Sequence, residues 1–141
     1  MGKINISRLI LGGIVAGIAI DLIDYLVDGV WLANRWAAGL ALLGRSNFGP
    51  VQILWFNVLG ILTGITAIWI YAGIRPRFGP GVKTAIYAGI AVWLLTVLYP
   101  NVGFMWVPHL FSKHLTLYTT LGGIVEVVFG TVVGASVYKE T

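Results

Sequence analysis

Acidic side chains interrupt two of the long apolar stretches of this sequence. Asp21 and Asp24 lie in the first stretch, and Glu126 lies in the last. At the helical rise of 1.5 Å per residue, Asp21 would lie about 18 Å into a hydrocarbon core about 30 Å thick. Glu126 would lie near the middle, so each carboxylate should be protonated, paired or hydrated in a cavity. These acids, together with Asn57, are candidates for a proton or cation site.

Two other interpretations of these acids stay open. Protonated carboxyl groups can hydrogen-bond across helices and fix their packing without binding any ion. Alternatively, the first helix enters the membrane near Ile4 rather than Leu9, which would bring Asp21 and Asp24 to the outer interface. The position of Glu126 is less ambiguous, because it stands midway along its apolar stretch.

The sequence carries no recognisable catalytic motif. It contains no cysteine, which excludes thiol redox chemistry and cysteine-ligated clusters. His109 and His114 lie in a short connection and are five residues apart, so they do not share a helical face. With an outer acid such as Asp28 they would make at most an adventitious metal site, and solvated loop histidines are the interpretation we favour. We therefore expect neither an enzyme nor a bound cofactor or metal.

The composition predicts a membrane protein. The chain has 141 residues, of which 58% are hydrophobic and 10% charged, and its mean hydropathy is +0.91. Such a chain cannot hide its apolar surface in one small soluble core. We predict one all-α domain over residues 1–141, a bundle of four transmembrane helices without a soluble domain. The predicted spans are 9–31, 51–74, 82–107 and 115–138, with a shorter interfacial segment at 33–43.

Small residues recur at helical spacing in the predicted spans. On the first span, Gly13, Gly17, Asp21, Asp24 and Asp28 follow one stripe, so the glycines and the acids share a face. Glycine pairs let another backbone approach closely, and this face should therefore meet protein rather than lipid. The predicted helix-packing positions are Gly13, Gly17, Gly60, Gly64, Gly130 and Gly134.

Local signals predict where helices begin, bend and end. Asn5 or Ser7 should cap the first span, and Ser112 should cap the fourth. The segment Arg75-Pro76-Arg77 should end the second span. Pro100 should kink the outer half of the third span, because it removes a helix hydrogen bond.

Positive charges predict the topology. The larger group of basic residues, which we assign to the cytoplasmic side, comprises Lys3, Arg8, Arg75, Arg77, Lys83 and Lys139; the smaller group comprises Arg35, Arg45 and Lys113. Both termini should therefore be cytoplasmic. The net charge of +4 is scattered rather than gathered in a block, so nucleic acid is not an expected partner.

Three segments carry a resemblance to a known family. The runs Arg8–Gly17, Trp69–Gly81 and Gly123–Glu126 resemble an uncharacterised family of small four-span bacterial membrane proteins. The resemblance covers most of the chain and implies a multi-pass protein of the bacterial inner membrane. That family has no established activity, so it assigns no function to any residue here.

Two functional hypotheses follow. The first is a non-enzymatic accessory subunit or scaffold, embedded in the lipid bilayer and docked to another membrane protein or to itself. The alternative is a small proton- or cation-coupled channel or transporter that uses Asp21, Asp24 and Glu126. A membrane enzyme ranks third. A dry, fully packed core would favour the subunit, whereas a polar outward cleft that reaches Glu126 would favour transport.

Overall fold

The computed structural model describes residues 4–140, and its regular elements over that range are all helices. Lys3, which contributes to the predicted topology, lies outside the described residues. The elements are α1 (Ile6–Asp24), η1 (Tyr25–Trp31), α2 (Ala33–Leu42), α3 (Pro50–Phe78), α4 (Val82–Trp93), η2 (Leu94–Leu98), η3 (Asn101–Trp106) and α5 (Lys113–Val137), where η marks a π-helix.

Four continuous helical rods are long and apolar enough to cross a membrane. They are Ile6–Trp31, Pro50–Phe78, Val82–Trp106 and Lys113–Val137. The prediction of an all-helical chain with four potential membrane spans is therefore confirmed. α2 follows the first rod as a short separate helix, in the place of the predicted interfacial segment.

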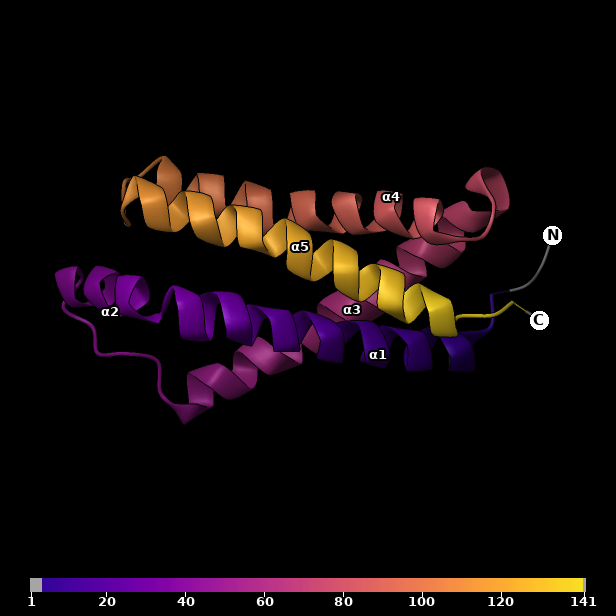
Figure 1. Ribbon diagram of the computed structural model, residues 1–141, viewed down its shortest axis with the longest axis horizontal. Coiled ribbons are helices and arrows are strands. Elements are labelled where there is room, and N and C mark those ends of the chain that lie inside the picture. The colour runs from indigo at the N-terminus through magenta and orange to yellow at the C-terminus, as the bar shows by residue number, and fades with distance from the viewer. Residues whose placement is uncertain (1–3, 141) are drawn as a thin grey trace.

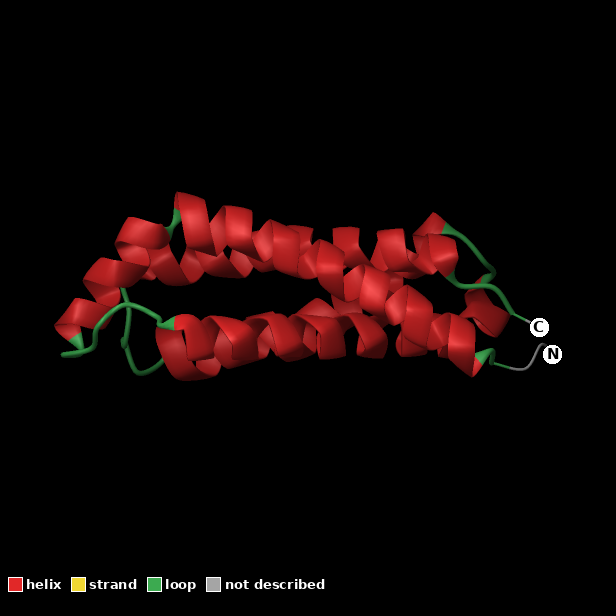
Figure 2. Ribbon diagram, turned by 90° about the horizontal axis from the view of Figure 1, so that it is seen from below, coloured by secondary structure: helices red, strands yellow, loops and turns green. Residues whose placement is uncertain are grey.

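The four rods lie side by side in an elongated bundle (Figure 2). α1 begins and α5 ends at one end of the bundle, where α3 also turns into α4 (Figure 1). α2 lies at the opposite end. α1 packs along both α3 and α5, and α4 packs against α5 and α3. α1 therefore has protein on two sides, which decides where its glycines and acids point.

One side of α1 approaches α3 at glycine positions. A Cβ added to Gly13 would lie 2.5 Å from the Cα of Ile65, and one added to Gly17 would meet the backbone of Ile61. On α3, Gly64 lies against the backbone of Gly13 and Gly17. Because real Cβ atoms do not come this close to backbone, the two helices leave no room for a side chain here.

The other side of α1 approaches α5 in the same way. A Cβ on Gly12 would lie 2.9 Å from the carbonyl oxygen of Gly134. A Cβ on Gly130 would lie 2.5 Å from the Cγ1 of Ile20, and Gly134 also lies against Ala16. Small residues thus line both contacts of α1 in the half of the bundle that holds the chain ends.

Two of the predicted caps are present. The Asn5 side chain accepts a hydrogen bond from the backbone N–H of Arg8 at 3.0 Å and begins α1. The Ser112 hydroxyl accepts one from Leu115 at 3.2 Å and begins α5. Each cap satisfies one of the backbone N–H groups that a helix start leaves without a partner.

The predicted end of the second span is wrong by about one turn. α3 continues through Pro76 and ends at Phe78, and the N–H of Gly79 still donates to the carbonyl of Arg75 at 2.8 Å. The chain leaves the helix at Gly79, where φ is +82°, a conformation that suits glycine. Pro100 lies between η2 and η3, so the backbone around this proline has the wide turns of a π-helix.

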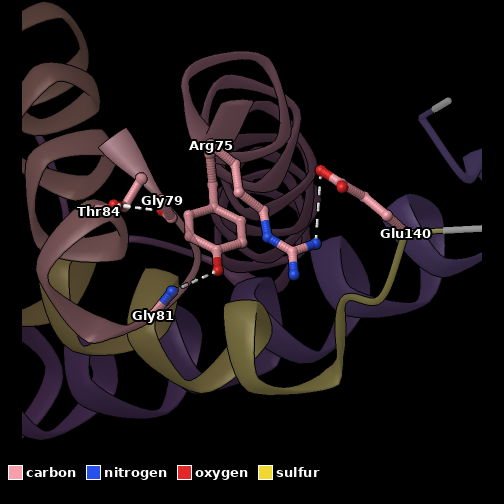
Figure 3. A network of polar contacts seen from close by, with 6 residues as sticks. Arg75, Gly79, Gly81, Thr84 and Glu140 are labelled. Atoms are coloured by element: carbon pink, nitrogen blue, oxygen red, sulfur yellow. Dashed lines mark hydrogen bonds and ion pairs between the residues drawn. The ribbon is translucent and has the colours of Figure 1, made fainter. Parts of the chain in front are cut away.

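A polar network holds the α3–α4 turn and the end of the chain together (Figure 3). The Tyr71 hydroxyl accepts a hydrogen bond from the N–H of Gly81, and the Thr84 hydroxyl donates to the carbonyl of Gly79. Arg75 lies 3.5 Å from the Glu140 carboxylate. These contacts order the end of the bundle opposite to α2.

Candidate acidic site

Three carboxylates meet between α1 and α5. One oxygen from each of Asp24, Asp28 and Glu126 lies within 4.8 Å of the others. Asp24 ends α1 and Asp28 lies in η1, so the α-to-π transition separates them. We call these three residues the acidic cluster. It combines one long acidic side chain from α5 with two short ones from the first rod.

Helix packing sets the level of Glu126 along α1. Gly122, one turn before it, lies against Val27, and Gly130, one turn after it, lies against Ile20. Glu126 therefore falls opposite the stretch of the first rod that lies between Ile20 of α1 and Val27 of η1, which contains Asp24. At Gly122 and Gly130 the two helices lie close together, and between these two contacts the Glu126 carboxylate lies beside those of Asp24 and Asp28.

Glu126 is buried, with 6% of its surface exposed. Its Oε1 atom is buried and has no hydrogen-bond partner among the described residues. A buried polar atom without a partner costs free energy, and most native structures avoid it. A proton or a cation shared with Asp24 and Asp28 would supply the missing interaction.

Asp28 connects the acidic cluster to α2. Its Oδ1 atom accepts a hydrogen bond from the indole N–H of Trp36 at 2.7 Å. Trp36 packs edge-on against Phe111, which precedes α5. Asp28 was not among the predicted ion-site residues. Its spacing of four residues from Asp24 was the sequence signal that could have added it to them, because residues four apart lie on the same face of a helix.

Asp21 and Asn57 stand apart from the cluster. Asp21 is half-buried, and its carboxylate lies against Gly60 of α3 rather than beside Glu126. Asn57 is exposed, and its amide donates a hydrogen bond within its own helix, to the carbonyl of Ile53. Of the predicted ion-site residues, the structure therefore brings together Asp24 and Glu126.

A pocket of about 840 Å³ adjoins the cluster. It lies between α1, η1, α2 and the first part of α3, and Figure 1 shows that this part of α3 runs away from α1. Asp21, Asp24 and Asp28 all line it. On α3 its lining extends to Gly60 and Thr63, next to the close contacts of α1 with α3, and the Asp21 carboxylate lies against Gly60 there.

Aromatic side chains form much of the remaining wall. The ring of Trp36 in α2 packs at a tilt against that of Phe48 in the α2–α3 connection, with ring centroids 5.8 Å apart. Phe48 packs edge-on against Phe56 of α3, with centroids 5.1 Å apart. These three rings and Tyr25 line the pocket. The described structure thus has a pocket lined by both apolar and acidic side chains, and Glu126 is not among the residues that line it.

Neither histidine joins the acidic cluster. Within residues 4–140, the side chains that could together hold a metal ion are the three carboxylates. His114 instead stacks on Tyr118 at 6.2 Å. The structure therefore places the candidate ion site on carboxylates alone, and it adds Asp28 to the predicted residues Asp24 and Glu126.

Comparisons with known proteins add no family. No protein-family model matches the chain, and neither the curated proteins nor the solved structures contain a match. The resemblance to a four-span bacterial family therefore stays a prediction, and the geometry of the site carries the functional argument.

Proposed function

We propose that this protein is a small cation-coupled membrane channel or transporter and that the acidic cluster is its cation site. The observation that carries the proposal is the buried, unpartnered Oε1 of Glu126 beside the carboxylates of Asp24 and Asp28. Acids inside a membrane span are costly to keep, and they mark ion paths in many membrane proteins.

The ligand atoms favour a hard cation. The cluster offers carboxylate oxygens only, which suit Ca²⁺, Mg²⁺ or Mn²⁺ better than metals that prefer nitrogen or sulfur. One oxygen from each carboxylate lies within 4.8 Å of the others. An ion at their centre would be at most about 2.8 Å from each oxygen, so small side-chain movements would bring all three to the distance of about 2.3–2.6 Å at which oxygen binds Ca²⁺.

The pocket provides a route to this site. Asp24 and Asp28 belong both to the cluster and to the pocket wall, so a cation in the pocket meets two of its three ligands directly. The described members of the larger group of basic residues belong to the end of the bundle that holds the chain ends and the α3–α4 turn, whereas the pocket lies toward the other end, near α2. Because basic residues are enriched on the cytoplasmic side, this supports termini in the cytoplasm and a pocket that opens to the outside.

The proposal includes a location and a mode of assembly. We infer a bacterial inner membrane from the resemblance in sequence. We also infer that glycine pairs of the GxxxG type drive the association of α1 with α3, because their backbones approach at Gly13, Gly17 and Gly64. The accessory-subunit hypothesis stays a prediction, since no contact within residues 4–140 points specifically to a partner protein.

Binding of Mn²⁺ tests the cation site. Purified protein in phosphatidylcholine nanodiscs should gain thermal stability with rising Mn²⁺ concentration, because an ion that binds the folded state stabilises it. Glu126→Gln keeps the shape of the side chain but removes its charge, and it should weaken the effect at least about tenfold in Mn²⁺ concentration.

Glu140→Gln is the matched control, because Glu140 is a carboxylate at the other end of the bundle that pairs with Arg75. This variant should respond to Mn²⁺ as the wild type does. An equal response of the wild type and Glu126→Gln would reject the assignment of the cation site.

A further inference from the structure

We infer that the pocket beside the acidic cluster binds an amphipathic organic cation, with its charged centre near Asp21 and its apolar body against the aromatic wall. This inference rests on the proposed function, because it names the class of substrate that a cation-coupled transporter of this form would carry. It adds a second site, which shares Asp24 and Asp28 with the acidic cluster but is centred on a different carboxylate, Asp21.

The size of the pocket points to an organic ligand. Its volume of about 840 Å³ falls in the range of about 300–1,000 Å³ that is typical of sites for small organic molecules. A metal ion with six waters needs only about 200 Å³, at about 30 Å³ per water. An inorganic ion therefore accounts for the acidic cluster but leaves most of the pocket unexplained.

The charge of the lining selects cations. Among the described residues, those that line the pocket include Asp21, Asp24 and Asp28 but no lysine, arginine or histidine. The nearby Arg35 lies over the ring of Tyr118 on α5, 4.8 Å from its centre, and is not part of the lining. A ligand that carries phosphate or carboxylate would meet repulsion without a compensating basic group.

The aromatic wall suits the apolar body of such a ligand. Tyr25, Trp36, Phe48 and Phe56 line the same pocket as the three aspartates. Aromatic faces attract cationic centres and also bury apolar groups, so the two halves of an amphipathic cation find complementary surfaces.

The pocket borders on surfaces that face the bilayer. Ile18 and Leu22 of α1 and Leu59 of α3 line it and are more than half exposed in the isolated chain. All three belong to helices that are apolar enough to span a membrane. A ligand dissolved in the bilayer can therefore approach the aspartates from the side, between α1 and α3.

Asp21 gives the inference its specific test. It lines the pocket and lies against Gly60, but it is not one of the three carboxylates of the acidic cluster. Loss of its charge should weaken the binding of an organic cation while the cluster keeps its ligands for an inorganic ion.

The experiment measures binding of radiolabelled tetraphenylphosphonium to the full chain in phosphatidylcholine nanodiscs by equilibrium dialysis. The inference predicts saturable binding above that of protein-free nanodiscs. Dodecyltrimethylammonium should compete, whereas uncharged triphenylphosphine oxide should not. Asp21→Asn should weaken binding at least about tenfold, and Glu140→Gln should leave it unchanged. Circular dichroism and thermal unfolding of each variant establish that it is folded.

Binding no greater than in protein-free nanodiscs, equal competition by the uncharged compound, or no effect of Asp21→Asn in a folded variant would each overturn the inference. The Mn²⁺ titration separates this failure from failure of the proposed function. Saturable, Asp21-dependent binding without any response to Mn²⁺ would support the organic-cation site and reject the inorganic one. A response to Mn²⁺ that depends on Glu126, without tetraphenylphosphonium binding, would do the reverse.

Discussion

Replacement of Gly64 by alanine tests whether backbone contact between α1 and α3 holds the bundle together. The added methyl group would lie 2.7 Å from the Cα of Gly17, whereas ordinary contacts begin near 3.4 Å. The obstacle is backbone, so a change of side-chain rotamer cannot relieve it. The backbone N of Gly17 and the carbonyl oxygen of Gly13 lie closer still. The helices would therefore have to separate locally by more than about 0.7 Å, and overpacking of this kind costs about 1–3 kcal/mol.

Gly73→Ala is the matched control, because Gly73 lies on the same helix and a Cβ there meets nothing within 4 Å. Both substitutions gain about 1 kcal/mol from the higher helix propensity of alanine. Gly64→Ala should therefore be less stable than Gly73→Ala by about 1–3 kcal/mol. The measurement is the loss of helical circular dichroism as sodium dodecyl sulfate is added to protein in mild detergent. Equal stability of the two variants would refute the proposed packing of α1 against α3.

Two further predictions concern α2 and the topology. Trp36→Phe removes the hydrogen bond to Asp28, and it should lower the free energy of unfolding by about 1.5–3 kcal/mol, because the acceptor is a carboxylate; the same detergent titration measures it, and unchanged stability would contradict this role of the indole. A cysteine introduced at Ser46, in the connection between α2 and α3, should react with a membrane-impermeant maleimide in intact cells, whereas one introduced at Ser136 should not. The reverse labelling pattern would refute the orientation.

The sequence was sufficient to predict four helices that are long and apolar enough to span a membrane, because helix length and apolar character both follow from long apolar runs. Each run exceeds the length that a bilayer core requires, and few local details can change that. The position of Pro76 shows where such reasoning fails. A proline inside a helix often ends it, but here the Gly79 N–H still bonds to the carbonyl of Arg75, so α3 continues for another turn.

The candidate site was predictable only in part. Regular α-helical spacing put Asp21, Asp24 and Asp28 on one stripe, yet Asp21 lies against α3 while the other two approach Glu126 on α5. Asp21 and Asp24 diverge because α1 has partners on two sides, and the π-helix that begins at Tyr25 affects only the position of Asp28. The pocket depends on where the glycine contacts between α1 and α3 stop, and a single sequence does not reveal which glycines of two distant helices meet.

Uptake of Mn²⁺ into sealed vesicles tests the central claim most directly. Vesicles that contain the purified protein and an internal Mn²⁺-quenched dye should lose fluorescence faster than protein-free vesicles when Mn²⁺ is added outside. Glu126→Gln should reduce the protein-dependent rate of uptake by at least about tenfold, because Glu126 belongs to the acidic cluster. Glu140→Gln should leave that rate unchanged, because Glu140 lies outside the cluster and pairs with Arg75. The same rate with wild-type protein, Glu126→Gln protein and no protein would contradict a role for this cluster in cation transport.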